Sequence, residues 1–339
     1  MKQILVLGEV LLRLTPPGNL KIGQNNSFNM CFGGAEANVA VGLANLGIGT
    51  RIITALPNNE LGDYAKSFLR SYGVDCNYIV TKGERVGLYY YEEGCSARKA
   101  KVVYDRKYSS INELRYDDID IDCALENIEL LHVSGITFAL SDDVREVAMK
   151  IIDKAKEKGI KISVDLNYRA KLFKSYYEFV SIMKPVVKDS YICFGWLNKD
   201  TENFKVLDAS EDEISDEVFI EKFRYMKEDL NVRYVATTLR TGSPFNYHTL
   251  SGILFNGNKI YRSSKYEFNM ISRIGGGDAF ASGIIKKLVC DSISDNEAVI
   301  EFGTATAVLK QTQIGDVSIS TESDVIELIE NKNLGSVNR

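Results

Sequence analysis

The feature that most constrains the fold is a regular alternation of apolar, strand-like runs and amphipathic, helix-like runs, which begins near residue 130. Residues 131–134, 160–165, 191–194 and 234–237 are predicted strands, and residues 142–158, 176–188 and 218–229 are predicted helices. Strands that alternate with helices form a mainly parallel sheet with helices on both faces. Because ligands of such sheets bind at the carboxyl ends of the strands, we expect the site at that edge.

The first third of the chain follows the same logic but contains an insertion. Its predicted strands and helices are, in chain order, residues 4–7, 35–46, 51–55 and 61–72. Residues 10–32 and 85–108 interrupt this order and are expected to form a small β lid. The prolines and asparagines of the first stretch predict turns and short strands, and the aromatic and β-branched runs of the second predict antiparallel strands. No repeat or long linker divides the chain. We therefore expect residues 1–339 to form a single α/β domain with a discontinuous lid.

Composition excludes several classes of function. A formal net charge of −5 and the absence of a basic run argue against a nucleic-acid partner. The six cysteines lack CxxC spacing and only two histidines are present, so we expect free thiols and no zinc or iron–sulfur centre. The apolar N-terminal run is too short for a signal peptide, and no stretch reaches the length of a membrane span. A cytoplasmic protein without a membrane partner is expected.

Residues 274–283, with the sequence Ile-Gly-Gly-Gly-Asp-Ala-Phe-Ala-Ser-Gly, predict an anion site. Gly275, Gly276 and Gly277 allow the backbone to approach a ligand closely, and the helix that follows adds the positive end of its dipole. Asp278 does not help to bind a phosphate, but it can take a proton from a hydroxyl that attacks one. A glycine-rich turn before an acidic first helical turn is the alternative, and the motif alone leaves both interpretations open.

Side chains that follow other predicted strands are candidates for the same cleft. They include Glu9, Gly34, residues 165–169 and residues 238–240. Asp165, Asn167 and Arg169 offer an acceptor, an amide and a guanidinium within one turn. The planar fork of Arg169 suits a carboxylate or a phosphate, although an ordinary pair with a surface acid is the alternative.

The predicted lid carries hydroxyl donors and a cation. Tyr104 and Arg106 lie on one of its strands, and Tyr89, Tyr90 and Tyr91 lie on the neighbouring strand. A lid over a small polar substrate needs such groups facing inward, but a row of tyrosines also packs, and we expect packing for at least one of the three. Within an apolar strand, His132 is predicted to be a core histidine.

Two motifs resemble signatures of a known family. Residues 33–40, Gly-Gly-Ala-Glu-Ala-Asn-Val-Ala, resemble the first signature of the ribokinase-like (PfkB) carbohydrate kinases, and residues 275–278 resemble the second. The similarity covers nearly the whole chain. Further stretches resemble the 2-keto-3-deoxygluconate kinase branch of that family, and these are residues 8–18, 103–106, 165–169, 238–240 and 310–316.

The resemblance implies a ribokinase-like three-layer α/β/α domain, with a mainly parallel central sheet, that transfers the γ-phosphoryl of ATP, with Mg²⁺, to the 6-hydroxyl of 2-keto-3-deoxygluconate. By similarity Asp278 is the general base, and Gly275, Gly276 and Gly277 form the anion hole. The implied sugar-acid ligands are Gly34, Tyr89, Tyr104, Arg106, Asp165, Asn167 and Arg169. The implied nucleotide ligands are Asn198, Thr238, Arg240, Gly275 and Gly277. A homo-oligomer formed through the lid is also expected.

The chain departs from the family pattern at a few positions. Ser272 and Arg273 stand where an acid is usual, and Asn58-Asn59 stands where aspartates are common. In the motif that helps to place magnesium, Glu202 follows Asn198 one residue late, so the metal-positioning residues stay unassigned.

Three alternative functions stay open to different degrees. A fructokinase-like or ribokinase activity is one alternative, although two candidate arginines agree better with an acidic sugar. A sugar-acid-binding protein without activity is another, but it would have no use for Asp278 behind the glycines. A dinucleotide-dependent dehydrogenase would need G-x-G-x-x-G after the first strand, and Gly8-Glu9-Val10 does not supply it.

Overall fold

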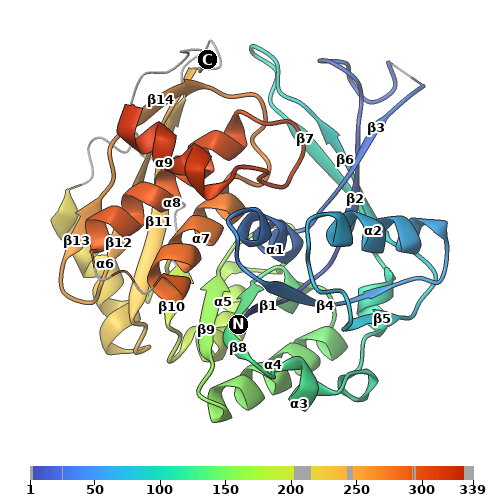
Figure 1. Cartoon of the computed structure of the whole chain (residues 1–339), viewed down its shortest axis with the longest axis horizontal. Helices are drawn as coiled ribbons and strands as arrows, with labels where there is room; N and C mark the ends of the chain where they lie inside the picture. Colours follow the sequence, from blue (N-terminus) through green and yellow to red (C-terminus); the bar gives the residue numbers. More distant parts are fainter. Residues whose placement is uncertain are drawn as a thin grey trace.

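A ten-stranded, mostly parallel sheet forms the centre of the protein (Figure 1). The computed structural model describes residues 3–24, 26–201, 215–242, 247–291, 293 and 295–331. The strands run in the order β13-β12-β11-β10-β9-β8-β1-β4-β5, and β14 pairs with β12. Their bounds are β1 Gln3–Leu7, β4 Thr50–Leu56, β5 Ile79–Thr81, β8 Ile128–Ser134, β9 Lys161–Asp165, β10 Ile192–Phe194, β11 Tyr234–Gly242, β12 Tyr247–Phe255, β13 Ile260–Arg262 and β14 Tyr266–Asn269. The pairs from β5 through β11 are parallel, whereas the pairs of β12 are antiparallel.

Helices cover both faces of this sheet. Their bounds are α1 Ala35–Asn45, α2 Glu60–Ser71, α3 Ile121–Ala124, α4 Asp142–Glu157, α5 Tyr176–Val187, α6 Asp216–Glu228, α7 Gly276–Ile285, α8 Asn296–Gln311 and α9 Glu322–Asn331. Short 3₁₀ turns occupy Ser110–Glu113, Tyr116–Asp118 and Thr137–Ala139, and a π-helical turn, Lys286–Cys290, follows α7. Several helices begin at side-chain caps. Asn59 accepts from two N–H groups of α2, and Ser141, Ser175 and Asp295 cap α4, α5 and α8.

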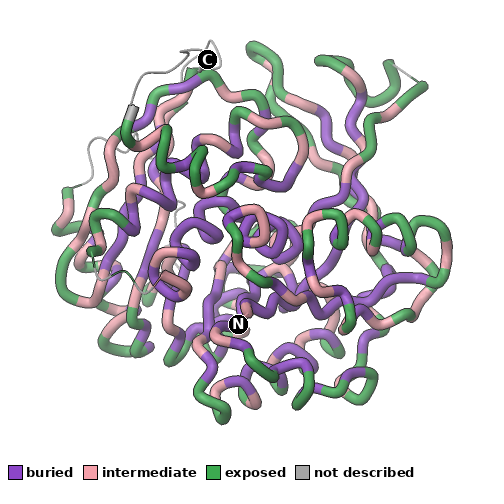
Figure 2. The backbone as a smooth tube through the Cα atoms, viewed as in Figure 1, coloured by how far each residue is buried: buried purple, intermediate pink, exposed green. Residues whose placement is uncertain are grey.

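Two hydrophobic cores lie on opposite sides of the sheet, as the alternation of side chains along β1 shows. Ile4 and Val6 pack with α1, α2, α7, α8 and α9, whereas Leu5 and Leu7 pack with α3, α4, α5 and α6. Figure 2 shows the buried backbone running through the centre of the molecule. The arrangement is the three-layer α/β/α fold that the sequence predicted.

A separate four-stranded sheet covers one end of the molecule (Figure 1). It has the order β3-β2-β6-β7, with bounds β2 Leu11–Thr15, β3 Asn29–Gly33, β6 Gly87–Glu92 and β7 Lys101–Asp105. The pairing puts Cys31, Arg13, Tyr89 and Tyr104 in one row across the sheet, and Met30, Leu14, Tyr90 and Val103 in the adjacent row. Adjacent rows point to opposite faces. The tyrosines of β6 therefore alternate, and Tyr90 stacks edge-on against Phe28, away from Tyr89.

Three strands of the large sheet, β11, β5 and β14, differ clearly from the predictions. Residues 238–240 do not follow a strand but lie inside β11, because antiparallel pairing with β12 continues from Val235 to Gly242. β5 and β14 are only three and four residues long and were not predicted. His132 is buried, its Nδ1 lies 2.8 Å from Ser163 Oγ, and burial lowers its pKa to about 3, so the core interpretation is confirmed.

Two further predictions concern the cysteines and the membrane. All six cysteines are free, as predicted. No helix in the described part of the chain is both long and apolar enough to cross a membrane.

Candidate functional site

A cleft of about 630 Å³ lies between the two sheets, and nearly all of the predicted site residues line it. The predicted residues in its wall are Gly34, Tyr89, Tyr104, Arg106, Asp165, Asn167, Arg169, Thr238, Arg240, Gly275, Gly276, Gly277 and Asp278. They come from α1, α7, the four-stranded sheet, and strands or strand ends of the large sheet. Asn198 is not part of this wall. The backbone N–H and the side-chain amide of Asn198 both donate to Tyr176 Oη, at 2.9 and 3.2 Å. Its role in nucleotide binding stays a prediction.

The glycine run forms the N-terminus of α7. Gly275 is the N-cap residue and has a left-handed φ of 83°. A Cβ on Gly275 would lie 1.8 Å from the carbonyl oxygen of Asp316, so the turn needs glycine for both conformation and space. Gly276 and Gly277 begin the helix, and N–H groups in a first helical turn lack intrahelical acceptors. An anion in the cleft would face these donors and the positive end of the helix dipole.

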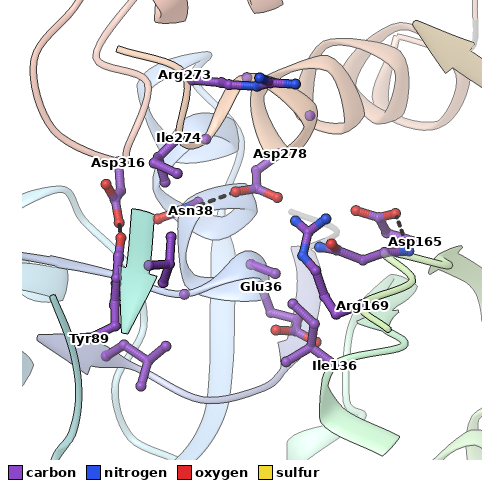
Figure 3. A pocket seen from close by; sticks show the side chains of 18 of the residues that line it. Glu36, Asn38, Tyr89, Ile136, Asp165, Arg169, Arg273, Ile274, Asp278 and Asp316 are labelled. Carbon is purple, nitrogen blue, oxygen red and sulfur yellow. Dashed lines mark hydrogen bonds between the residues drawn. The ribbon is translucent and has the colours of Figure 1, made fainter. Parts of the chain in front are cut away.

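Asp278 is held in the first turn of α7 as a buried carboxyl group. Asn38 Nδ2, on α1, donates to Asp278 Oδ2 at 2.7 Å (Figure 3). Burial raises the pKa of Asp278 to about 8; the Asn38 hydrogen bond lowers this pKa, whereas the charges of Asp165 and Glu36 raise it. A carboxyl group with a raised pKa is a stronger base once it is ionised, and this one lies beside the anion-binding turn.

The end of β9 and the loop that follows it bring a second carboxyl group and a cation to the same end of the cleft. Burial raises the pKa of Asp165 to about 6, and the charge of Arg169 lowers it. Asp165 accepts from the N–H of Asn167 at 3.1 Å, and Asn167 has a left-handed φ of 37°, a conformation that asparagine tolerates. Arg169 extends toward Asp278 and Asp165 (Figure 3) and forms no ion pair with another described residue.

Glu36 is a third buried acid near this loop. Its Oε1 accepts from the Ser134 N–H at 2.8 Å and from Thr137 Oγ1 at 2.6 Å. Burial raises the pKa of Glu36, whereas these hydrogen bonds lower it. The glycine at position 8 is needed beside it, because a Cβ on Gly8 would lie 2.2 Å from the Glu36 carboxylate. Glu36 thus ties α1 to the end of β8.

A buried charge cluster joins the four-stranded sheet to the segment after α8. Both carboxylate oxygens of Asp316 are used. One accepts from Arg13 of β2, and the other accepts from the Tyr89 hydroxyl of β6, a contact that Figure 3 shows. Burial and the charge of Asp316 raise the pKa of Tyr89 well above its usual range. Asp316 lies in the stretch 310–316 that resembles the family, and no role was predicted for it. Its contact with Tyr89 spans 227 residues, and no local signal could have revealed it.

The second predicted sugar-acid arginine already has a partner in the protein. Arg106 Nε donates to Glu9 Oε2 at 2.8 Å, and Ser109 Oγ donates to the other oxygen of Glu9. Glu9 and Arg106 are both almost completely buried. Tyr104 lies across the sheet from Tyr89, with ring centroids 6.1 Å apart, and the Arg106 guanidinium lies over its ring. Arg106 is therefore held in a fixed position at the cleft wall.

The positions at which the chain departs from the family pattern have definite surroundings. The N–H of Ser272 donates to the carbonyl of Gln311 at 3.1 Å, and Arg273 is exposed and lines the cleft. Glu202 lies outside the described residues. Among the described residues, no group of three or more His, Cys, Asp or Glu side chains could hold a metal ion. A magnesium ion bound mainly by nucleotide phosphates and water fits such a site better than a protein cage.

Comparisons with known proteins agree on one family. Residues 1–218 match the sequence model described as pfkB family carbohydrate kinase. The structure resembles a 2-dehydro-3-deoxygluconokinase from Thermotoga maritima with a TM-score of 0.90 and 33% identity, over 97% of this chain and 99% of that one. A 2-dehydro-3-deoxygalactonokinase from Haloferax volcanii is 28% identical over 98% of both chains. A 5-dehydro-2-deoxygluconokinase from Clostridium perfringens is 26% identical over 96% of this chain and 91% of its own length.

Proposed function

The chain belongs to the pfkB family of carbohydrate kinases, and within that family we propose that it phosphorylates 2-keto-3-deoxygluconate at its 6-hydroxyl. It is an ATP-dependent carbohydrate kinase, and the proposal concerns the sugar and the residues that act on it. The three relatives described above are all named for dehydro-deoxy sugar acids. Their names support an acid rather than a neutral sugar as the substrate.

The observation that carries the proposal is the position of Asp278 in the first turn of α7. The hydroxyl oxygen of the sugar attacks the γ-phosphorus, the bond from phosphorus to the ADP oxygen breaks, and Asp278 takes the hydroxyl proton. The N–H groups of Gly275, Gly276 and Gly277 face the charge on the transferring phosphoryl group. Asn38 fixes the carboxylate through its 2.7 Å hydrogen bond, so the base needs little reorganisation. Magnesium bound with the nucleotide would supply further positive charge.

Two arginines in the cleft wall support a carboxylate-bearing substrate. Arg169 lines the cleft and has no ion-pair partner among the described residues, so its guanidinium is available to a ligand. Arg106 is held by Glu9 and offers its remaining N–H groups. Tyr104, Asn167 and Gly34 would contact the sugar between these cations and Asp278. A substrate carboxylate would give the exposed Arg169 guanidinium a charged, bidentate partner, which a neutral sugar does not offer.

We propose that the whole chain forms a single kinase domain that carries out this reaction. The four-stranded sheet would close the cleft as a lid, and Thr238 and Arg240 of β11 would contact the nucleotide. In that sheet, the row that contains Met30 and Val103 leaves these two side chains exposed, with exposed fractions of 55% and 53%. Association of two copies through this row is part of the proposal. Light scattering tests it: Met30→Asp with Val103→Asp should yield monomers, and an unchanged mass would contradict it.

The function is tested by ADP release on a panel of sugars. The wild-type protein with ATP and magnesium is assayed with 2-keto-3-deoxygluconate, 2-keto-3-deoxygalactonate, 5-keto-2-deoxygluconate, fructose and ribose. We expect the highest kcat/KM with 2-keto-3-deoxygluconate. Higher turnover with fructose or ribose would favour the neutral-sugar kinase, and binding of the sugar acid without ADP release would favour a binding protein.

A further inference from the structure

Lys310, in the last turn of α8, is a buried cation that the proposed reaction does not yet use. Its exposed fraction is 0%. The Nζ ammonium donates to the carbonyl of Gly315 at 2.9 Å and lies 3.5 Å from the carbonyl of Gln313. Burying an ammonium against neutral carbonyls is costly because they do not fully offset its loss of hydration. Such a buried charge suggests a functional role.

No carboxylate of the described part of the chain forms an ion pair with Lys310. Asp316 is near enough to raise the pKa of Lys310, but its two oxygens bind Arg13 and Tyr89. Two cations, Arg13 and Lys310, therefore share one buried anion. The cluster formed by Arg13, Lys310 and Asp316 carries a net positive charge when all three groups are ionised.

This cluster lies directly behind the anion-binding turn. A Cβ on Gly275 would lie 3.1 Å from Lys310 Cε and 1.8 Å from the Asp316 carbonyl oxygen. The carbonyl of Gln311 accepts from the N–H groups of Ile271 and Ser272, at 2.8 and 3.1 Å. Residues 310–316 thus pack behind the turn at Gly275, and the Lys310 ammonium holds residues 313–315 in place through their carbonyl groups. Lys310 does not line the cleft.

We propose that Lys310 is a positioning residue for phosphoryl transfer: its ammonium fixes residues 313–316 against Gly275 and keeps positive charge behind the anion-binding N–H groups. The inference rests on the proposed kinase function. As the bond to ADP breaks, negative charge shifts toward the leaving oxygen and spreads over the three phosphoryl oxygens, and only then does the positive charge behind the turn act fully, so the effect falls on kcat and leaves the KM of the sugar nearly unchanged.

The ionisation of Lys310 agrees with this role. Burial lowers its pKa to about 8, with Arg13 lowering it further, whereas Asp316 and Asp278 raise it. The ammonium is thus the main form at neutral pH. A pH profile alone would not isolate Lys310, because the pKa of Asp278 is also about 8. Chemical rescue isolates the charge instead.

The test compares Lys310→Ala, which leaves a cavity, with Lys310→Met, which fills most of the same volume without charge. Both should lower kcat roughly 10- to 100-fold, less than the loss of a direct oxyanion donor. Ammonium or methylammonium chloride should restore at least about tenfold of kcat in Lys310→Ala relative to sodium chloride at equal ionic strength, and nothing in Lys310→Met. Lys156→Ala is the matched control, since Lys156 Nζ also donates to a carbonyl, that of Lys188 at 2.8 Å, but at the surface of α4. Lys156→Ala should keep the wild-type kcat, and ammonium should not change that kcat.

Three results would overturn the inference alone: kcat of Lys310→Met within twofold of wild type, a loss in Lys310→Ala that ammonium does not reverse, or a change confined to KM. If Lys310→Ala does not fold, Lys310→Gln keeps a donor for the Gly315 carbonyl without the charge. A wild-type kcat in Lys310→Gln would then overturn the inference. The variants are assayed with whichever sugar the wild type phosphorylates. No turnover by the wild type with any sugar would overturn the proposed function and the inference together.

Discussion

Replacing Asp278 with asparagine should make the stability of the protein less sensitive to pH. The pKa of Asp278 is about 8 in the folded protein, against an ordinary value of 3.8. The folded state therefore holds one more proton than the unfolded state between these two values. The contribution of this carboxyl group to stability is fully present below about pH 4 and is lost as the pH rises through about 8.

The size of the effect follows from this window. Within it, one extra bound proton gives a slope of about 1.4 kcal/mol per pH unit. Between pH 5 and 7 the wild-type protein should thus lose roughly 3 kcal/mol that Asp278→Asn does not lose. Asp165, with a pKa raised to about 6, titrates in both proteins, so its own slope largely cancels in the difference. The asparagine can still accept from Asn38.

Urea unfolding at pH 5, 6 and 7 measures this difference. The single tryptophan, Trp196, packs against Phe219 and Phe223 and reports unfolding by its fluorescence. Asp153→Asn, at an exposed position of α4, is the matched control and should show no pH-dependent difference from wild type. A constant stability difference between Asp278→Asn and wild type across this pH range would refute the reasoning.

Further predictions concern other parts of the site. Arg169→Ala should raise the KM for the sugar acid roughly 30- to 150-fold, because it removes a charged bidentate contact worth about 2–3 kcal/mol. The KM for fructose should barely change, and equal effects on both substrates in steady-state assays would count against a carboxylate contact. Gly275→Ala should destabilise the fold by more than about 2 kcal/mol, since its Cβ would overlap the Asp316 carbonyl, whereas Gly277→Ala, with no atom within 4 Å of its Cβ, should be neutral or slightly stabilising in thermal unfolding. Asp316→Asn should cost about 3–5 kcal/mol in urea unfolding because it leaves its buried arginine partner uncompensated, and a cost below about 1 kcal/mol would contradict the charge cluster.

The layered fold could be predicted because its signal is local. α1, α2, α4, α5 and α6 showed helical periodicity, and glycines such as Gly47 and Gly159, which both have left-handed φ values, mark helix ends, whereas α8 and α9 were not predicted. β5 and β14 were missed because three or four residues carry too little pattern to identify a strand. The end of β11 was predicted too early because pairing with β12, rather than composition, determines where it ends.

The residues that line the candidate cleft could be predicted, but the contacts that those residues make with each other could not. Strand ends and glycine motifs brought Asp165, Arg169 and Asp278 to one cleft. The partners of several site residues are far away in the sequence, as with Glu9, which binds Arg106, and Asn38, which binds Asp278 across 240 residues. Such contacts depend on tertiary packing, which the spacing of residues along one chain does not encode.

The most direct test of the account is the reaction itself, followed with the wild type and Asp278→Asn. Wild-type protein, ATP and magnesium should convert 2-keto-3-deoxygluconate to a product whose phosphorus couples to the C6 protons in NMR spectra, with one ADP formed per sugar. Asp278→Asn should bind the sugar by calorimetry with similar affinity, yet its kcat should fall by roughly 10²–10⁴. Absence of sugar-dependent ADP from the wild type, or near-normal turnover by Asp278→Asn, would contradict the account.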